Sequence, residues 1–153
     1  MAGKKTFSHR EVVTGSAYRI SSFVAIGLCN ESSSKTVIPG WDAGSWAYHG
    51  DDGRKFGGTS RGTQYNNTYG TGDTICCGVD FNSNTVDFYK NGISLGRPQI
   101  SNLTRSLSLT SVTGTAFEGV KGRLFPVIGI GNLDVHLRIR FRPEEFLFPL
   151  RTP

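Results

Sequence analysis

Two tryptophans and a pair of acids lie close together in the segment 41–52, and this combination of residues could act on a sugar. Trp41 and Trp46 offer stacking platforms, and Asp51 and Asp52 supply two carboxylates, as glycoside hydrolysis requires. The run Asp51-Asp52-Gly53 also predicts a turn, in which short acidic side chains accept hydrogen bonds from nearby backbone amides. Adjacent carboxylates on extended backbone point apart. We therefore expect a structural use of these acids, with no metal ion.

His49, beside these acids, is a candidate general base. A base of this kind needs a nucleophile within reach, and no serine, cysteine or aspartate of this sequence stands in a recognisable nucleophile motif. Gly129-Ile-Gly131 lacks the third glycine and the following helix of a dinucleotide-binding loop. His136 is isolated and is expected at the surface. The sequence thus predicts a protein that is not an enzyme, with no catalytic residues and no cofactor.

The three cysteines, Cys29, Cys76 and Cys77, have no C-x-x-C spacing. Cys76 and Cys77 are adjacent in an apolar run, so in a strand their side chains point to opposite faces and do not easily chelate one metal ion. This pattern predicts buried, reduced thiols that serve as small hydrophobic side chains. We therefore expect an intracellular protein, in the cytoplasm, the nucleus or both.

Basic residues exceed acidic ones, 17 to 12, which gives a formal net charge of +5. Arg138, Arg140 and Arg142 alternate with apolar residues, which places the three arginines on one face of a predicted strand. Such a face is either a solvated outer surface or a stripe that binds phosphates. No aromatic residue shares the face to stack on bases. The sequence favours the solvated surface, and we expect no nucleic-acid partner.

Short apolar runs separated by turn residues must position these side chains. Residues 23–29 predict a buried strand. In 75–81 the larger apolar residues recur at every second position, which is the pattern of a strand with one covered face. The run 85–90 returns after a turn at 82–84, and Asn91-Gly92 suits a type I′ turn, because both central residues take positive φ. Residues 75–95 therefore predict three antiparallel strands. The runs 124–130 and 135–141 are predicted to pair with each other.

The fold class follows from these runs. No segment keeps a helical period for three turns, so regular short strands predict an all-β protein, a β-sandwich. The 153 residues suit one domain.

No window approaches the roughly 18 apolar residues of a membrane span and no secretory signal is visible, so we expect no contact with a membrane. Residues 97–115 are rich in Ser and Thr and contain no acid, which predicts a long exposed loop.

The order of the short motifs resembles that of the SPRY domain. The segment GWDAGSWAYHGDDG at 40–53 is similar to the hallmark of that family. Further blocks agree in order and spacing: G-x-x-Y-x-x-x-Y-x-x-G-D at 62–73, ICCGVD at 75–80, FYKNG at 88–92, LG at 95–96 and AFEGVKGRLFP at 116–126. The YHGDDG version most resembles the Ran-binding protein M family, whose members work in a multisubunit ubiquitin-ligase assembly.

The resemblance runs from about residue 11 to residue 148 and implies a SPRY-type bent antiparallel β-sandwich of two sheets. We expect 1–10 to be an N-terminal extension or strand lead-in, 11–150 the SPRY domain and 151–153 a C-terminal tail. The stretch 97–115 is an insertion between two blocks that the family joins directly. Residues 10–13 resemble only the end of the family's first paired strand. The LisH, CTLH and CRA segments that accompany this domain in Ran-binding protein M relatives are not in this sequence.

The resemblance also implies a partner surface. In SPRY domains this surface is built from loops at one end of the sandwich, and known ligands are often short extended peptides. Transfer by position points to the stretches 18–22, 32–42 and 131–134. The implied contact residues are Tyr18, Ser21, Ser22, Lys35, Val37, Ile38, Pro39, Trp41, Asn132 and Leu133. Apolar side chains there would supply desolvated anchors, and Asn and Ser would satisfy the hydrogen bonds of the peptide.

The sequence thus predicts a monomeric, non-enzymatic adaptor that binds a short peptide segment of another protein within an intracellular ubiquitin-ligase complex. Two alternatives stay open. An RNA- or nucleic-acid-associated SPRY module would use Arg138, Arg140 and Arg142 to contact phosphates, with a steep dependence on salt. A glycan-binding or hydrolytic sandwich would depend on Asp51 and Asp52.

Overall fold

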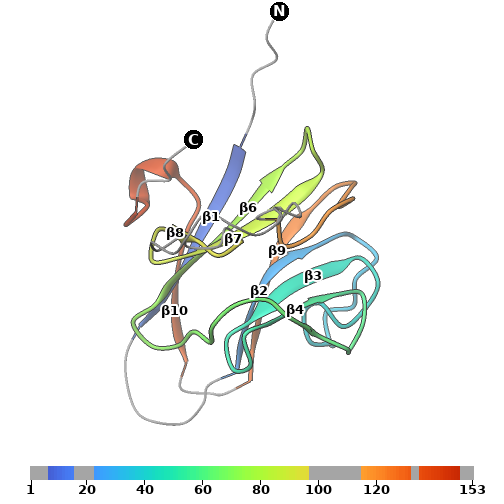
Figure 1. Ribbon diagram of the computed structural model, residues 1–153, viewed down its shortest axis with the longest axis horizontal. Helices are drawn as coiled ribbons and strands as arrows, with labels where there is room; N and C mark the ends of the chain where they lie inside the picture. Colours follow the sequence, from blue (N-terminus) through green and yellow to red (C-terminus); the bar gives the residue numbers. More distant parts are fainter. Residues whose placement is uncertain (1–6, 16–22, 97–114, 132–134, 149–153) are drawn as a thin grey trace, which may run out of the picture.

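Two antiparallel sheets face each other in the computed structural model, which describes residues 7–15, 23–96, 115–131 and 135–148 (Figure 1). Sheet A has the order β10 (His136–Arg140), β1 (Phe7–Gly15), β6 (Thr74–Asp80), β7 (Thr85–Lys90) and β8 (Ile93–Ser94). Sheet B has the order β5 (Thr63–Gln64), β4 (Arg54–Gly57), β3 (Ser45–His49), β2 (Val24–Cys29) and β9 (Phe125–Ile130). A 3-10 helix, Pro143–Glu145, follows β10. The predicted fold class, an antiparallel β-sandwich of two sheets, is confirmed.

The core lies between the inner faces of the two sheets. Alternate residues of β2 and β6 supply its aliphatic part, because alternate side chains of a strand share a face. These residues are Val24, Ile26, Leu28, Ile75, Cys77 and Val79. Tyr48 of β3 and Phe88 of β7 are fully buried, and their ring centroids lie 5.5 Å apart. This aromatic contact joins sheet B to sheet A at the centre of the sandwich.

The three-stranded antiparallel unit predicted for 75–95 is confirmed as β6, β7 and β8. Its second turn has the predicted chemistry, since Asn91 and Gly92 have φ values of 51° and 80°. Asn84 in the first turn also has a positive φ, of 56°. Asparagine and glycine tolerate this left-handed region far better than other residues do. The positions of both turns were therefore predictable from their own residues.

The prediction that β6 has one covered face is wrong. Thr74, Cys76 and Gly78, which alternate with the core residues, are buried as well. β6 is a central strand of sheet A, and the register partners of Cys76 and Gly78 in β7 are the larger residues Tyr89 and Asp87. Small side chains beside larger cross-strand neighbours lose access to solvent on the outer face too.

The prediction that the last two strands pair with each other is also wrong. β9 pairs with β2 in sheet B, and β10 pairs with β1 in sheet A. β10 carries apolar residues at alternate positions, whereas β9 is apolar or glycine at every position. Neither pattern specifies which strand lies alongside. The chain therefore changes sheets between them, and each strand lies at the edge of its own sheet (Figure 1).

The three cysteines are free and buried, as predicted for small hydrophobic thiols. The predicted loop at 97–115 lies outside the described residues except for Thr115. Within the described ranges, no helix is long and apolar enough to cross a membrane.

Candidate partner-binding loop

The segment 32–42 connects β2 to β3 and packs on the outer face of sheet B. Its Pro39 is buried, and the carbonyl oxygen of Pro39 accepts a hydrogen bond of 2.8 Å from Nε2 of His49 in β3. On β9, a Cβ atom added to Gly129 would lie 2.6 Å from Cδ of Pro39. Only glycine therefore leaves room for this proline, and the loop is seated on both β3 and β9.

Hydrogen bonds fix the loop at several points. The carboxylate of Asp42 accepts bonds from the backbone N–H of Ser34 at 2.6 Å and from the hydroxyl of Ser33 at 3.2 Å. The backbone N–H of Gly40 donates to Oγ of Ser45 at 2.7 Å, while the carbonyl of Gly40 accepts from the N–H of Gly58 at 2.9 Å. A backbone held in this way loses little conformational entropy when a partner binds to it.

Five of the predicted contact residues lie on this loop, in different environments. Val37 and Trp41 are each 39% exposed, which is a large exposed fraction for apolar side chains. Lys35 is exposed and Ile38 is half-buried. Pro39 is buried against the sheet, so it positions the loop. The loop therefore presents Val37 and Trp41 to solvent as candidate anchors, with a lysine nearby in the sequence.

The other five predicted contact residues lie outside the described part of the chain. They are Tyr18, Ser21, Ser22, Asn132 and Leu133. The described residues that border these two stretches, Phe23 and Gly131, are joined by a backbone hydrogen bond of 2.9 Å. The ring of Phe23 lies edge-on to His49, with centroids 5.2 Å apart. The borders of both stretches therefore meet close to the imidazole that supports Pro39.

His49 supports the loop, a role that the sequence analysis did not assign to it. Its ring stacks on Phe56 of β4 with centroids 4.0 Å apart, and the edge of Phe23 closes another side. Burial lowers the pKa of His49 below its usual value of 6.5, against the opposing effects of the Pro39 carbonyl and of the Asp52 and Asp51 carboxylates. The imidazole is therefore neutral near pH 7, with Nε2 as its protonated nitrogen.

Acidification is expected to destabilise the domain through His49. In the unfolded chain the imidazole takes up a proton near pH 6.5, whereas the buried ring does so only at lower pH. The unfolded state thus binds more protons in this interval, and the free energy of unfolding falls as the pH drops from about 6.5 through the lowered pKa. Urea denaturation measured from about pH 8 to about pH 5 tests this, since histidine titrates there.

The variant His49→Gln isolates the contribution of this imidazole. Glutamine keeps an N–H donor but does not titrate, so the unfolding free energy of the variant should depend less on pH over the same interval. Equal pH dependence of the variant and the wild type would contradict the assignment.

Asp51 and Asp52 lie in a turn, as predicted, and the backbone N–H of Arg54 donates to the carboxylate of Asp52 at 2.9 Å. The backbone there is a turn, so the argument that adjacent carboxylates on extended backbone point apart does not apply to this pair. Metal-ligating atoms of His49, Asp51 and Asp52 all lie within 4.8 Å of one another. Nε2 of His49 is occupied by Pro39, which leaves Nδ1 and the carboxylates. This geometry alone assigns no metal to the group.

The predicted row of arginines lies at the edge of sheet A. Arg138 is exposed in β10, Arg140 is half-buried at the end of β10, and Arg142 is exposed just beyond it. β10 is a strand of sheet A, whereas the 32–42 loop connects two strands of sheet B. The structure therefore does not bring the arginines into the candidate loop site.

Fold and loop together define a β-sandwich that exposes Val37 and Trp41 on the 32–42 loop, whose backbone is held by hydrogen bonds. The family model of the SPRY domain matches residues 11–142, and the chain belongs to the SPRY family. SPRY domains generally mediate protein–protein interactions, so membership supports a role as a protein-interaction module.

Curated relatives include the Ran-binding proteins 9/10 homolog of Drosophila melanogaster, 32% identical over 128 residues. Human Ran-binding protein 9 is 31% identical over 128 residues. Each alignment covers 84% of this chain, but only 11% of the fly protein and 15% of the human one. The chain therefore spans less than a fifth of the length of these relatives.

Solved structures agree on the fold. A human SPRY domain superposes with a TM-score of 0.64 at 27% identity, over 88% of this chain and 76% of that one. The SPRY domain of human HERC1 superposes with a TM-score of 0.60 at 16% identity, over 88% of this chain and 74% of that one. The second likeness shows that the sandwich persists at low identity.

Proposed function

We propose that this domain is a non-enzymatic adaptor module that binds a short extended peptide segment of another protein through the 32–42 loop. The observation that carries the proposal is the exposure of Val37 and Trp41 on a loop whose backbone is held by His49, Ser45 and Asp42. Aromatic side chains on a preorganised surface are the usual source of binding energy in interfaces.

The proposed surface extends to the two bordering stretches. Tyr18, Ser21, Ser22, Asn132 and Leu133 are proposed as further contacts, with Lys35 and Ile38 at the loop itself. The hydrogen bond between Phe23 and Gly131 supports this extension, because it joins the described ends of both stretches.

The proposed setting is an intracellular ubiquitin-ligase complex of the Ran-binding protein M type, in the cytoplasm, the nucleus or both. The similarity to Ran-binding proteins 9 and 10 supports it. We propose that the domain acts there as a monomer. Capture of ligase subunits together with the domain from native lysate would support this setting, and their absence from every capture would contradict it.

Replacement of Trp41 by alanine is expected to weaken partner binding by about thirtyfold, since loss of an anchor residue costs about 2 kcal/mol or more. The measurement has two steps. Affinity capture from native lysate and peptide mapping first define the bound segment, and fluorescence anisotropy with that synthetic segment then gives the dissociation constant. The thermal midpoint should change by only a few degrees.

The control is Phe81→Ala, which removes another exposed aromatic ring, directly after β6 in sheet A. It should leave the dissociation constant unchanged. Val37→Ser is a second loop variant, useful if Trp41→Ala unfolds. Normal binding by both loop variants would exclude the 32–42 loop as the site.

A further inference from the structure

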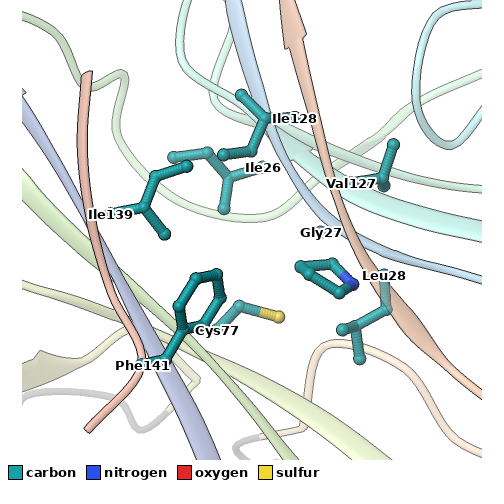
Figure 2. Close-up of a pocket in the computed structure, with 9 residues that line it drawn as sticks. Ile26, Gly27, Leu28, Cys77, Val127, Ile128, Ile139 and Phe141 are labelled. Carbon is teal, nitrogen blue, oxygen red and sulfur yellow. The ribbon is translucent and has the colours of Figure 1, made fainter.

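A cavity of about 270 Å³ lies between the two sheets, beside the edge strands β9 and β10 (Figure 2). Figure 2 shows Ile139 on one side of it, Ile26 and Ile128 on another, and Cys77 below. Its walls come from both sheets, and they include Ile26, Leu28, Cys77, Pro126, Ile128 and Ile139. The cavity belongs to the open side of the sandwich and is separate from the 32–42 loop.

The chemistry of this cavity favours an aliphatic occupant. Its lining is apolar, and water needs two to four polar partners to occupy a buried site. At about 270 Å³ the cavity is smaller than the roughly 300–1,000 Å³ of typical small-molecule sites, so one or two aliphatic side chains suit it better. Ile139 is 43% exposed beside it, and covering this side chain would remove apolar surface from water.

β10 adds a second feature, because it is an edge strand with two different faces. Among the described residues it pairs only with β1, on one side. Ile139 lines the cavity, while Arg138 and, just past the strand, Arg142 occupy the alternate positions and are exposed. An edge strand can accept an added strand through backbone hydrogen bonds.

We propose that β10 and the cavity form a second docking surface, for an extended segment of another protein in which aliphatic residues alternate with Asp or Glu. The segment adds to sheet A beside β10. Its aliphatic side chains then share the face of Ile139 and enter the cavity. Its acidic side chains share the opposite face with Arg138 and Arg142, as favourable cross-strand pairs.

β10 suits this role better than β9. Pro126 lies in β9 and has no N–H to donate to an added strand. β10 contains no proline. Every residue of β10 therefore has a backbone N–H, and the cavity lies on the face that its Ile139 covers.

Charge argues for an acidic segment over a second copy of this chain. If β10 paired with β10 of another copy, Arg138 and Arg142 of both copies would lie on the same face of the joined sheet. Like charges on neighbouring strands are destabilising. A nucleic acid would satisfy the arginines but would bring no aliphatic side chain to the cavity. An alternating acidic and aliphatic strand satisfies both faces at once.

The test uses the purified 153-residue chain and a fluorescein-labelled probe peptide, Glu-Leu-Glu-Ile-Glu-Val-Glu with blocked ends. A control peptide has the same composition, with all acids at one end and all aliphatic residues at the other. Fluorescence anisotropy should detect binding of the alternating peptide, at least tenfold tighter than that of the control, since only alternation places each class of side chain on its own face.

Two pairs of variants test the two faces separately. The double change Arg138→Glu and Arg142→Glu should weaken probe binding at least tenfold. Arg54→Glu with Arg61→Glu changes the net charge equally at exposed residues, one in β4 of sheet B and one between β4 and β5, and should not weaken it. Ile139→Asp should weaken binding similarly, while Ile93→Asp on the exposed surface of β8 should not. Circular dichroism checks that each variant is folded.

Several results would overturn the proposal. One is equal binding of the alternating and the control peptide, or no binding of either. Another is a dimer in sedimentation experiments that Ile139→Asp dissociates, because β10 would then be covered by a second copy. A third is tighter binding of single-stranded oligo(U) than of the probe, lost in the Arg138 and Arg142 double variant, because the arginines would then be a phosphate site.

Discussion

Replacement of Phe88 by alanine is expected to lower the free energy of unfolding by about 3–5 kcal/mol, the usual cost of deleting a buried aromatic ring. Phe88 is fully buried and contacts the rings of Tyr48, Tyr65 and Phe117, with centroid distances of 5.5, 6.1 and 6.4 Å. The neighbouring rings come from β3, from the residue directly after β5 and from the 115–131 segment, so they cannot all move into the vacated space. Urea denaturation monitored by tryptophan fluorescence measures the effect.

This loss is large beside the stability of a typical domain, about 5–15 kcal/mol, so the variant is expected to be partly unfolded at elevated temperature. Phe81→Ala is the control, since Phe81 is 49% exposed and directly follows β6, which pairs with the β7 strand that contains Phe88. Its unfolding free energy should stay within about 0.5 kcal/mol of the wild type. A Phe88→Ala variant that loses less than about 1 kcal/mol would show that this ring is not central to the core.

The parts of the fold that were predictable from sequence depend on local chemistry. In a two-residue type I′ hairpin turn both central residues have positive φ, as Asn91 and Gly92 do. The β7–β8 turn was therefore predictable from this dipeptide alone. The partners of β9 and β10 were not visible. Alternation specifies a covered face for β10 and the apolar run of β9 specifies burial, whereas pairing with β2 or β1 depends on strands about a hundred residues or more away in the sequence.

The same distinction holds for the candidate site. The 32–42 loop was predicted from a resemblance, and the exposed side chains of Val37 and Trp41 lie on it. Its support by His49 was not predicted, because the hydrogen bond to Pro39 requires the loop to fold back over β3. The sequence shows only a histidine beside two acids, which suggests catalysis as readily as packing.

β9 separates the two proposed binding surfaces. Its outward-facing Gly129 lies under Pro39 of the loop, and its inward-facing Ile128 lines the cavity beside β10. Alternate residues of one strand thus serve opposite faces of sheet B. A variant that affects one surface should leave the other intact, provided that β9 keeps its pairing with β2. Parallel measurements on the loop and on β10 can therefore distinguish a local effect from displacement of the strand.

Replacement of Gly40 by alanine is expected to lower the free energy of unfolding by about 3 kcal/mol, since backbone strain and overpacking each cost about 1–3 kcal/mol. Gly40 has a φ of 91°. A Cβ atom there would lie 2.6 Å from Cβ and 2.7 Å from the carbonyl oxygen of Phe56 in β4. The loop must move away from the sheet to relieve this contact, which would strain the bonds of Gly40 to Ser45 and Gly58.

Because the same movement displaces Trp41, Gly40→Ala should also weaken binding through the 32–42 loop, although it removes no side chain from the surface. Gly122→Ala is the matched control: Gly122 has a φ of 94°, and no atom lies within 4 Å of its added Cβ. The control carries the backbone strain without the contact to Phe56, so its unfolding free energy should fall by only about 1 kcal/mol. Equal losses in the two variants would mean that Phe56 does not hold the loop in place. Urea denaturation, together with anisotropy using the segment mapped with Trp41→Ala, gives both readouts.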